Sequence, residues 1–372
     1  MHFTSTPMLH DMNIHSEDVM TAEMLKSPYH HPSAWTGAQM RESRDWIVRL
    51  DDAQNHELAA ALAFAKQRGA RIPQLSAEDF PLPTLQAALL ELRAEVNDGR
   101  GFVLLKGFDI DRYTLEDTAR VYWGIGAHLG TGRAQNAQGD LLGHVTDLGV
   151  DHRTDPNARG YQTRNLLRFH NDAMDIVALL CIRPARSGGL SRIVSSTAIH
   201  NAMLERRPDL LRVMYEPFHM DRRGEVPQGK TPWHVGPFFN LLDGRLFCGY
   251  NRAYVESAQR FEEVPRLTPE QIETLDMVNA LCADPEFHLD MAFERGDMQF
   301  ISNYTTLHSR TEYEDWPDKE RRRYLLRLWL DTSHFLRLPE SIAERQEDMR
   351  LWQQHPKPPI FDLSAVHAEL AH

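Results

Sequence analysis

Seven short apolar runs between residues 165 and 330 constrain the fold of this chain more than any other sequence feature. They are separated by polar loops at irregular spacing, without the alternating strands, helices and phosphate-binding glycines of βαβ units. Short strands of this kind, with helices before and between them, are typical of a barrel or jelly roll. The runs are NLLRFHND, DIVALLCI, LSRIVSS, LFCGYN, HLDMAF, MQFISN and RYLLRLWL. The predicted fold class is therefore α+β, with a mainly β core and flanking helices.

Helical periodicity surrounds the predicted strands. Thr114 is a candidate N-cap, and Thr268 with Gln271 has the pattern of a capping box. The glycine-bounded run GFVLLKGF at 101–108 predicts one more buried strand. The expected helices cover 52–67, 83–97, 114–128, about 196–215, a segment from Thr268 and about 338–352.

Domain organisation is predicted from the length and from the lack of linkers. The 372 residues are enough for one decorated domain or two ordinary ones, and the sequence shows no repeat and no low-complexity linker. We predict an N-terminal arm over 1–45, rich in His, Met, Ser and Pro, and a single catalytic domain over 46–372. The β core is expected at about 100–335 and a helical tail at about 338–372. The polar segment 130–165 is longer than an ordinary connection, which favours a functional loop.

Composition disfavours several classes of protein. There are 53 acidic and 41 basic residues, giving a net charge of −12, which argues against nucleic acid as a partner. No apolar run approaches the length of about 20 residues that spans a bilayer, and no secretory signal is recognised at the start. Three widely spaced cysteines suit a reducing compartment. The expected location is cytoplasmic and the expected partner a small molecule, with no membrane partner; a homo-oligomer stays open.

The run NLLRFHND contains a candidate metal site. Side chains two residues apart in a strand face the same way, so His170 and Asp172 can converge on one ion. The H-x-D pattern alone is weak, because it recurs at His219–Asp221 and His288–Asp290 and is more often a surface pair. The first pair lies between apolar runs, whereas the second runs into an expected polar loop and the third is expected to face outward in part. These surroundings favour the first pair.

A third ligand should come from a distant strand, because a barrel brings its first and last strands together. His308, which follows the run MQFISN by a few residues, is the best candidate. Taken alone, it would more often be a solvated loop histidine. Two histidines and one carboxylate that leave three open positions form the ligand set of non-haem iron(II) oxygenases.

The run RRRYLLRLWL places a cation in an apolar layer. Strand alternation puts Arg323, Arg327 and Trp329 on one face, with leucines and a tyrosine on the other. If both faces are covered, Arg327 is buried and needs an anion, because an unpaired buried charge is costly. A planar guanidinium suits a bidentate carboxylate. The alternative is an edge arginine that reaches solvent, as expected for Arg321 and Arg322.

Five segments together resemble the taurine dioxygenase-like (TauD/TfdA) family of iron(II)/2-oxoglutarate oxygenases. They occur in the family's order and span about 100–330. The segments are GFVLLKGF, FHND, RPARSGGLSRIVSS, FERGDMQFISNYTTLHSR and RRRYLLRLWL. The resemblance implies a double-stranded β-helix (jelly roll, cupin-like) and an enzyme that uses Fe(II), 2-oxoglutarate and O2. The chain reads HND where the family often has HTD, and this departure removes no ligand.

The resemblance also implies roles for individual residues. The pair His170–Asp172 would form the catalytic iron triad with His308. Arg327 would hold the distal C5 carboxylate of 2-oxoglutarate with help from Ser191, and Arg323 matches a family arginine near the C1 carboxylate or an anionic substrate. Substrate contacts are expected from loops over the barrel mouth and from the strand before the metal. The candidates are Asn165, Gln135, Asn136, His144, Phe169 and Arg323.

The function predicted on this basis is hydroxylation of a small substrate, of the anionic or amino-acid-like kind, with release of succinate and CO2. Asp172 favours hydroxylation over halogenation, because a halide takes the place of the carboxylate in the related halogenases; desaturation stays open. Two other classes stay open too. A cupin-like metal enzyme that does not use 2-oxoglutarate would not need Arg327. A non-catalytic β-barrel binding protein would tolerate the loss of His170.

Overall fold

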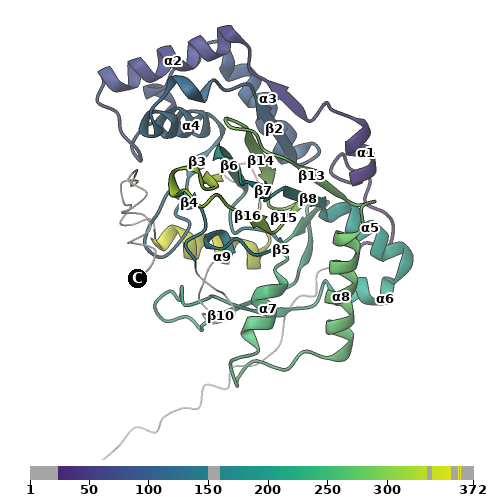
Figure 1. Ribbon diagram of the computed structural model, residues 1–372. Helices are drawn as coiled ribbons and strands as arrows, with labels where there is room; N and C mark the ends of the chain where they lie inside the picture. Colours follow the sequence, from purple (N-terminus) through teal and green to yellow (C-terminus); the bar gives the residue numbers. More distant parts are fainter. Residues whose placement is uncertain (1–23, 150–159, 333–336, 353–358, 360, 362–372) are drawn as a thin grey trace, which may run out of the picture.

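Two facing β-sheets form the centre of the computed structural model (Figure 1). The larger sheet runs in the order β1 (Ile47–Arg49), β2 (Phe102–Lys106), β14 (Met298–Ser302), β6 (Ile176–Arg183), β17 (Tyr324–Asp331) and β3 (Thr131–Gly132), and β4 (Leu142–Val145) also pairs with β17. The smaller sheet runs in the order β13 (His288–Met291), β8 (Ser191–Ser195), β15 (Thr306–Arg310) and β5 (Leu167–His170). Together they form the predicted double-stranded β-helix. The structure describes residues 24–149, 160–332, 337–352, 359 and 361.

Helices cover the outer faces of both sheets (Figure 1). The larger sheet is covered by α2 (Asp52–Gln67), α3 (Leu85–Asp98) and α4 (Leu115–Leu129), and the smaller by α5 (Ser196–Arg206), α6 (Pro208–Val213) and α8 (Pro269–Ala283). Further helices are α1 (Gly37–Glu42), α7 (Arg252–Ala258) and α9 (Glu340–Trp352). No helix in the described part of the chain is long and apolar enough to cross a bilayer.

Local sequence signals account for where these helices begin. The Thr114 side chain accepts a hydrogen bond from the backbone N–H of Asp117, and so caps α4 as predicted. Thr268 and Gln271 form the expected capping box at the start of α8. Short ribbons complete the fold: β7 (Ser187–Gly188) with β16 (Tyr313–Glu314), β9 (Phe218–Asp221) with β10 (Trp233–Gly236), and β11 (Phe239–Leu242) with β12 (Arg245–Cys248).

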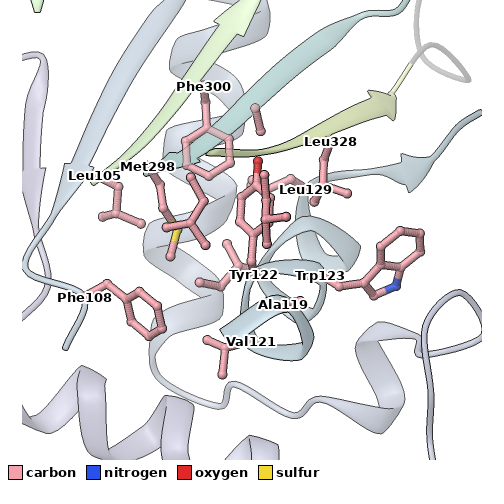
Figure 2. Close-up of a cluster of buried hydrophobic side chains, with 14 of the residues drawn as sticks. Leu105, Phe108, Ala119, Val121, Tyr122, Trp123, Leu129, Met298, Phe300 and Leu328 are labelled. Atoms are coloured by element: carbon pink, nitrogen blue, oxygen red, sulfur yellow. The ribbon is translucent and has the colours of Figure 1, made fainter. Parts of the chain in front are cut away.

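A large apolar cluster joins α2, α3 and α4 to the outer face of the larger sheet (Figure 2). Phe300 of β14 and Leu328 of β17 enter it from the sheet, and Tyr122 of α4 meets them from the helix layer. Trp329 instead faces the layer between the two sheets, and Leu325 belongs to a small separate cluster. The predicted division of the last strand into two faces is confirmed.

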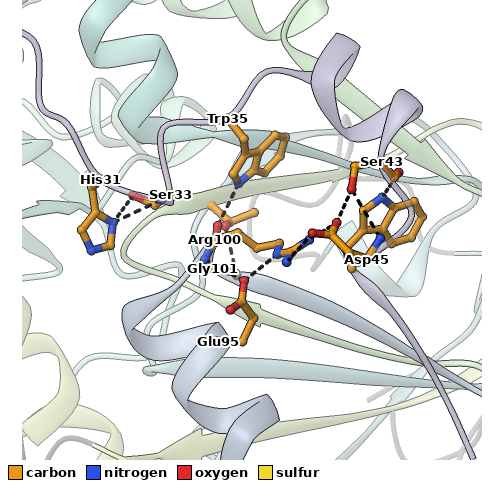
Figure 3. A network of polar contacts seen from close by, with 10 residues as sticks. His31, Ser33, Trp35, Ser43, Asp45, Glu95, Arg100 and Gly101 are labelled. Atoms are coloured by element: carbon orange, nitrogen blue, oxygen red, sulfur yellow. Dashed lines mark hydrogen bonds and ion pairs between the residues drawn. The ribbon is translucent and has the colours of Figure 1, made fainter.

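The segment before β1 lies against the body of the protein. Trp35 is buried and donates from Nε1 to the backbone carbonyl of Arg100 at 2.8 Å (Figure 3). The Arg100 guanidinium bonds Asp45 at 2.7 Å and Glu95 of α3 at 2.5 Å. This network attaches the part of the predicted arm that is described to the start of β2. Residues 1–23 of the arm and most of the predicted tail beyond 352 lie outside the described residues.

The His219–Asp221 pair ends β9 and runs into the loop that leads to β10, as expected. It is not a surface pair, however, because Asp221 is fully buried. Its carboxylate accepts a hydrogen bond from Ser257 at 2.5 Å and pairs with Arg260, whose Nε lies 3.1 Å from Oδ2. These partners are more than 30 residues away in the sequence, so the polarity of the local segment does not reveal that the carboxylate is buried and neutralised.

We expect Phe300→Ala to lower the free energy of unfolding by about 3–5 kcal/mol, because it removes a fully buried ring and leaves a cavity. Phe64→Ala is the matched control: Phe64 of α2 is 39 % exposed, so its replacement should cost at most about 0.5 kcal/mol. Urea unfolding followed by circular dichroism measures both values. Equal losses for the two variants would contradict the assigned core.

Candidate active site

Two neighbouring strands of the smaller sheet bring the predicted metal ligands together. β15 pairs antiparallel with β5, and their register places His308 directly opposite His170. Asp172 follows the end of β5 by two residues. One nitrogen from each histidine and one carboxylate oxygen lie within 4.8 Å of one another. The pair chosen from three H-x-D patterns and the distant histidine thus form a single cluster.

The distances within the cluster fit one metal ion. Nε2 of His170 lies 3.7 Å from Oδ1 of Asp172, and Nε2 of His308 lies 3.7 Å from Oδ2. Ligand atoms that share an ion through bonds of about 2 Å lie roughly 3–4 Å apart. Two histidines and one carboxylate form the 2-His-1-carboxylate triad. This triad leaves coordination positions on iron(II) open for substrates.

Neighbouring groups orient two of the ligands. Nδ1 of His170 lies 2.8 Å from the carbonyl of Arg168, so a proton on Nδ1 leaves the Nε2 lone pair facing the site. Trp329 donates from Nε1 to Oδ2 of Asp172 at 2.9 Å. The backbone N–H of Asp172 donates to Oδ1 of Asn303 at 3.1 Å. These contacts hold the His170 ring and the carboxylate in place before an ion binds.

The protonation states also favour metal binding. Burial opposes ionisation of Asp172, but the positive charge of Arg327, with smaller contributions from His308, His170 and the Trp329 hydrogen bond, outweighs it and holds the carboxyl pKa at about 2. Burial, together with His170, lowers the pKa of His308 to about 3, and burial lowers the pKa of His170 as well. At neutral pH the cluster therefore has two neutral imidazoles and one carboxylate, which are the forms that bind a metal.

A cavity of about 420 Å³ opens beside the triad. Its wall includes His170 and Asp172, the apolar side chains of Ala173 and Met349, and several arginines. Cavities of this size bind small molecules.

Arg327 is buried, as predicted, and faces the metal ligands. Its Nη1 lies 3.5 Å from Oδ2 of Asp172, and its guanidinium carbon lies 4.6 Å from the centroid of the Tyr161 ring and 4.9 Å from that of Trp329. Nε donates to Oε1 of Gln135 at 2.7 Å, and Gln135 donates to the Arg327 carbonyl at 2.8 Å. Gln135, a candidate substrate residue, lines the cavity but is used to hold this arginine.

The other candidate substrate residues do not line the cavity. Asn136 bonds Asp140 and stabilises its own loop, and His144 bonds the Tyr324 hydroxyl at 2.7 Å and stacks on that ring. Phe169 packs against the apolar cluster outside the smaller sheet, because alternation along β5 turns it away from His170. Asn165 meets Arg310 through its backbone carbonyl.

Arg323 and Arg310 form a second cationic cluster, outside the cavity lining. They are 4 % and 5 % exposed, and their guanidinium carbons lie 5.1 and 4.8 Å from the centre of the Tyr313 ring. Nη1 of Arg323 and both Nε and Nη1 of Arg310 have no hydrogen-bond partner among the described residues. Ser191 is the cross-strand neighbour of Arg310, and its hydroxyl donates to Gln299 at 2.9 Å.

Burial and mutual repulsion make this pair of arginines unusual. Burial lowers the pKa of both guanidinium groups, and with the positive charge of Arg323 it brings that of Arg310 to about 10. Two adjacent buried cations without a carboxylate ion-pair partner in the described structure provide a site for an anion. Sequence reasoning misses Arg310, although its place two residues after His308 puts it on the same strand face.

The family of the chain is shown by comparison with known proteins. Residues 31–329 match the family described as "Taurine catabolism dioxygenase TauD, TfdA family". The chain belongs to the TauD/TfdA family. This TauD/TfdA protein is an Fe(II)/2-oxoglutarate-dependent oxygenase, and its cofactors are Fe(II), 2-oxoglutarate and O2.

Two relatives are matched over nearly their whole length. This TauD/TfdA oxygenase is 31 % identical over 333 residues to FR-33289 synthase of Streptomyces rubellomurinus (strain ATCC 31215), covering 88 % of this chain and 97 % of that protein. It is 28 % identical over 378 residues to taurine hydroxylase-like protein SAT17 of Stachybotrys chartarum (strain CBS 109288 / IBT 7711), covering 96 % and 97 %. The similarity therefore extends well beyond the metal-binding motif.

Solved structures show the same fold. An asparagine oxygenase in complex with Fe(II), 2S,3S-3-hydroxyasparagine and succinate superimposes with a TM-score of 0.59 at 18 % identity, over 80 % of this chain and 98 % of that one. The non-heme iron oxygenase OrfP with Fe and alpha-ketoglutaric acid gives a TM-score of 0.55 at 16 % identity, over 78 % and 96 %. At these identities the likeness is evidence for the fold.

We expect His308→Ala to abolish retention of iron, because it removes one of three ligands and leaves too few to hold the ion. His219→Ala is the control, since His219 belongs to another H-x-D pair and lies outside the ligand cluster. Iron measured by elemental analysis after anaerobic loading and desalting tests both variants. Full retention of iron by His308→Ala would contradict the assigned triad.

Proposed function

We propose that this oxygenase hydroxylates a small amino-acid-like or anionic substrate and couples that reaction to conversion of 2-oxoglutarate into succinate and CO2. The observation that carries the proposal is that two members of the metal-ligand cluster, His170 and Asp172, lie in the wall of a cavity of about 420 Å³. The fold neighbours support the substrate class: one binds hydroxyasparagine and another binds hydroxy-arginine, each with iron and succinate.

We infer that Arg323 and Arg310 bind the distal C5 carboxylate of 2-oxoglutarate. The sequence assigns this role to Arg327, but that guanidinium already faces Asp172 and is held by Gln135. The buried pair of arginines lacks a carboxylate ion-pair partner in the described chain, and a carboxylate between them would satisfy the donors left without partners. In this proposal Ser191, the cross-strand neighbour of Arg310, adds a hydroxyl to the same site, whereas the sequence assigned it to the side of Arg327.

Arg327 is better placed for a group bound at the metal. Its Nη1 lies 3.5 Å from a metal-ligand oxygen, which is the environment expected for the C1 carboxylate of 2-oxoglutarate or for an anionic group of the substrate. The proposed roles of Arg327 in β17 and of Arg323, which directly precedes that strand, are therefore exchanged relative to the sequence assignment.

The protein supplies geometry and charge to the reaction. Bound iron supplies the activation of O2 and the oxidation of 2-oxoglutarate. His170, Asp172 and His308 hold the ion, and Trp329 holds the orientation of the carboxylate. Met349 and Ala173 give part of the cavity an apolar wall, which limits water near the reacting groups.

A cytoplasmic location and the oligomeric state stay predictions from the sequence. Cys181, Cys248 and Cys282 are free and buried, which agrees with a reducing compartment.

We expect Arg323→Gln and Arg310→Gln each to weaken 2-oxoglutarate binding by at least about tenfold, because each removes a charge-assisted hydrogen bond to a buried carboxylate. The measurement is an anaerobic titration of the iron(II) enzyme with 2-oxoglutarate, followed by the visible metal-to-ligand charge-transfer band. Arg321→Gln is the control: Arg321 is an exposed neighbour that lies over Trp316. Weakening confined to Arg327→Gln would restore the sequence assignment.

A screen of small amino acids and organic acids should identify a substrate that raises succinate release and gains one oxygen atom. Asp172→Ala should abolish both signals, because the iron site loses its carboxylate. Mass spectrometry of the product and a succinate assay measure them together. Product without succinate would indicate a cupin-like enzyme that does not use 2-oxoglutarate. Ligand binding that survives His170→Ala, without any turnover, would indicate a binding protein.

A further inference from the structure

A second, smaller cavity adjoins the active-site cavity beside the metal ligands. It has a volume of about 30 Å³, and its wall shares Asp172, Ala173, His234 and Arg345 with that of the larger cavity. The rest of its wall comes from the ends of β10 and β12 with the residues that follow them, from the turn after β14, and from the start of α9. The small cavity therefore reaches a metal ligand from a side that the larger cavity does not occupy.

The small cavity lies between the iron site and the protein surface. Asn303, which accepts a hydrogen bond from the backbone N–H of Asp172 at 3.1 Å, is buried at its inner end. Pro237, Ser341 and Ile342 line the same cavity and are partly exposed. A small molecule in this cavity would thus lie on a short path from solvent to the metal ligands.

Much of the wall is apolar. Burial raises the pKa of the Cys248 thiol to about 12, so this group is uncharged. Asn303 also donates to the Met174 carbonyl at 2.7 Å, and the Tyr304 hydroxyl donates to Asp175, so both side chains use their polar groups elsewhere. The lining residues without a charged or strongly polar side chain are Ala173, Met220, Pro237, Cys248, Gly249 and Ile342. Such a wall favours an apolar occupant over water.

Gly249 keeps this cavity open. A Cβ added at Gly249 would have no atom within 4 Å, and the φ of this glycine is not positive, so a side chain could be accommodated there. At Gly236, in contrast, a Cβ would lie 2.7 Å from Cβ of Ser341, so that glycine permits the close approach of α9. Replacement of Gly249 would therefore fill the cavity without displacing its walls.

The size of the cavity limits what it can hold. A cavity needs roughly 10–15 Å³ to hold one water molecule. The volume of about 30 Å³ therefore admits a diatomic molecule, whereas an amino acid or 2-oxoglutarate is too large. This enzyme uses one apolar diatomic reagent, O2, which must reach the iron when 2-oxoglutarate is already bound. A separate apolar cavity lets O2 arrive without competing for space in the larger one.

We propose that the small cavity is a binding and entry site for O2 beside the iron, and that Gly249 keeps it open. The assignment rests on the use of O2 by this enzyme and not on the class of its primary substrate. O2 is apolar, so its transfer from water into an apolar cavity is favourable. Filling the cavity should slow the arrival of a diatomic gas at iron(II) and leave the binding of 2-oxoglutarate unchanged.

Xenon tests the binding site without any reaction, because it occupies apolar cavities through van der Waals contacts alone. Diffraction from crystals of the unmodified protein held under xenon pressure should show xenon in the cavity lined by Gly249 and Ala173. Gly249→Val should not bind xenon there, because the valine methyl groups occupy the space. This measurement needs neither iron nor a substrate.

NO tests the entry route, because it is a diatomic gas that binds iron(II) directly. The anaerobic enzyme loaded with Fe(II) and 2-oxoglutarate is mixed with NO in a stopped-flow instrument, and binding is read from the visible absorbance. Gly249→Val should lower the second-order rate constant by at least about tenfold, because a gas molecule can pass a filled cavity only when packed side chains move. Gly249→Ala, which adds one methyl group, should lower it by at least about twofold.

Ala343→Val is the matched control, because it adds apolar bulk next to Ile342 on α9 and lines neither cavity. It should bind NO at the rate of the unmodified enzyme. Anaerobic titration of each variant with 2-oxoglutarate, followed by the charge-transfer band, should give the unmodified affinity and so show that the iron site is intact.

The proposal is overturned if xenon is absent from the small cavity of the unmodified protein, or if Gly249→Val binds NO as fast as Ala343→Val does. If Gly249→Val does not fold or binds 2-oxoglutarate weakly, Gly249→Ala decides, and an unchanged rate constant for NO in that variant overturns the proposal. Xenon bound in the cavity together with unchanged NO rates would mean that the cavity is not the route to the iron.

Discussion

The buried negative charge of Asp172 is the constraint on which the active site depends. A carboxylate in this environment must be matched by positive charge or hydrogen bonds, since its transfer from water is otherwise strongly unfavourable. β17 supplies both through Arg327 and Trp329, and β15 places His308 across from His170. Both sheets must therefore be complete before this carboxylate can be stabilised in the form that binds iron.

The protein has a net negative charge, but several of its arginines are buried. One pair, Arg323 and Arg310, lies outside the cavity lining, and other arginines, such as Arg222 and Arg327, line the cavity. Small acids can neutralise such clusters in the interior, whereas a net charge of −12 disfavours association with polyanions.

Much of the architecture could be predicted from local patterns. The apolar runs coincide with strands such as β6 and β14, and the caps at Thr114 and Thr268 form as expected. Alternation along β17 correctly separates the face toward the helices from the face toward the site. These features depend on neighbours within a few residues, so a sequence is sufficient to find them.

The sequence by itself determined the strand faces, because side-chain alternation is a local property, and its resemblance to a known family indicated His170, Asp172 and His308 as the metal ligands. Only the tertiary structure decided which groups meet across the site. Gln135 holds Arg327 from 192 residues away, and Asp221 meets Ser257 and Arg260 more than 30 residues along the chain. The placement of Arg345 on α9 likewise depends on Asp348 meeting Arg222, 126 residues earlier. Alternation tells which way a side chain points, but the register of the sheets and the packing of the helices set what it meets.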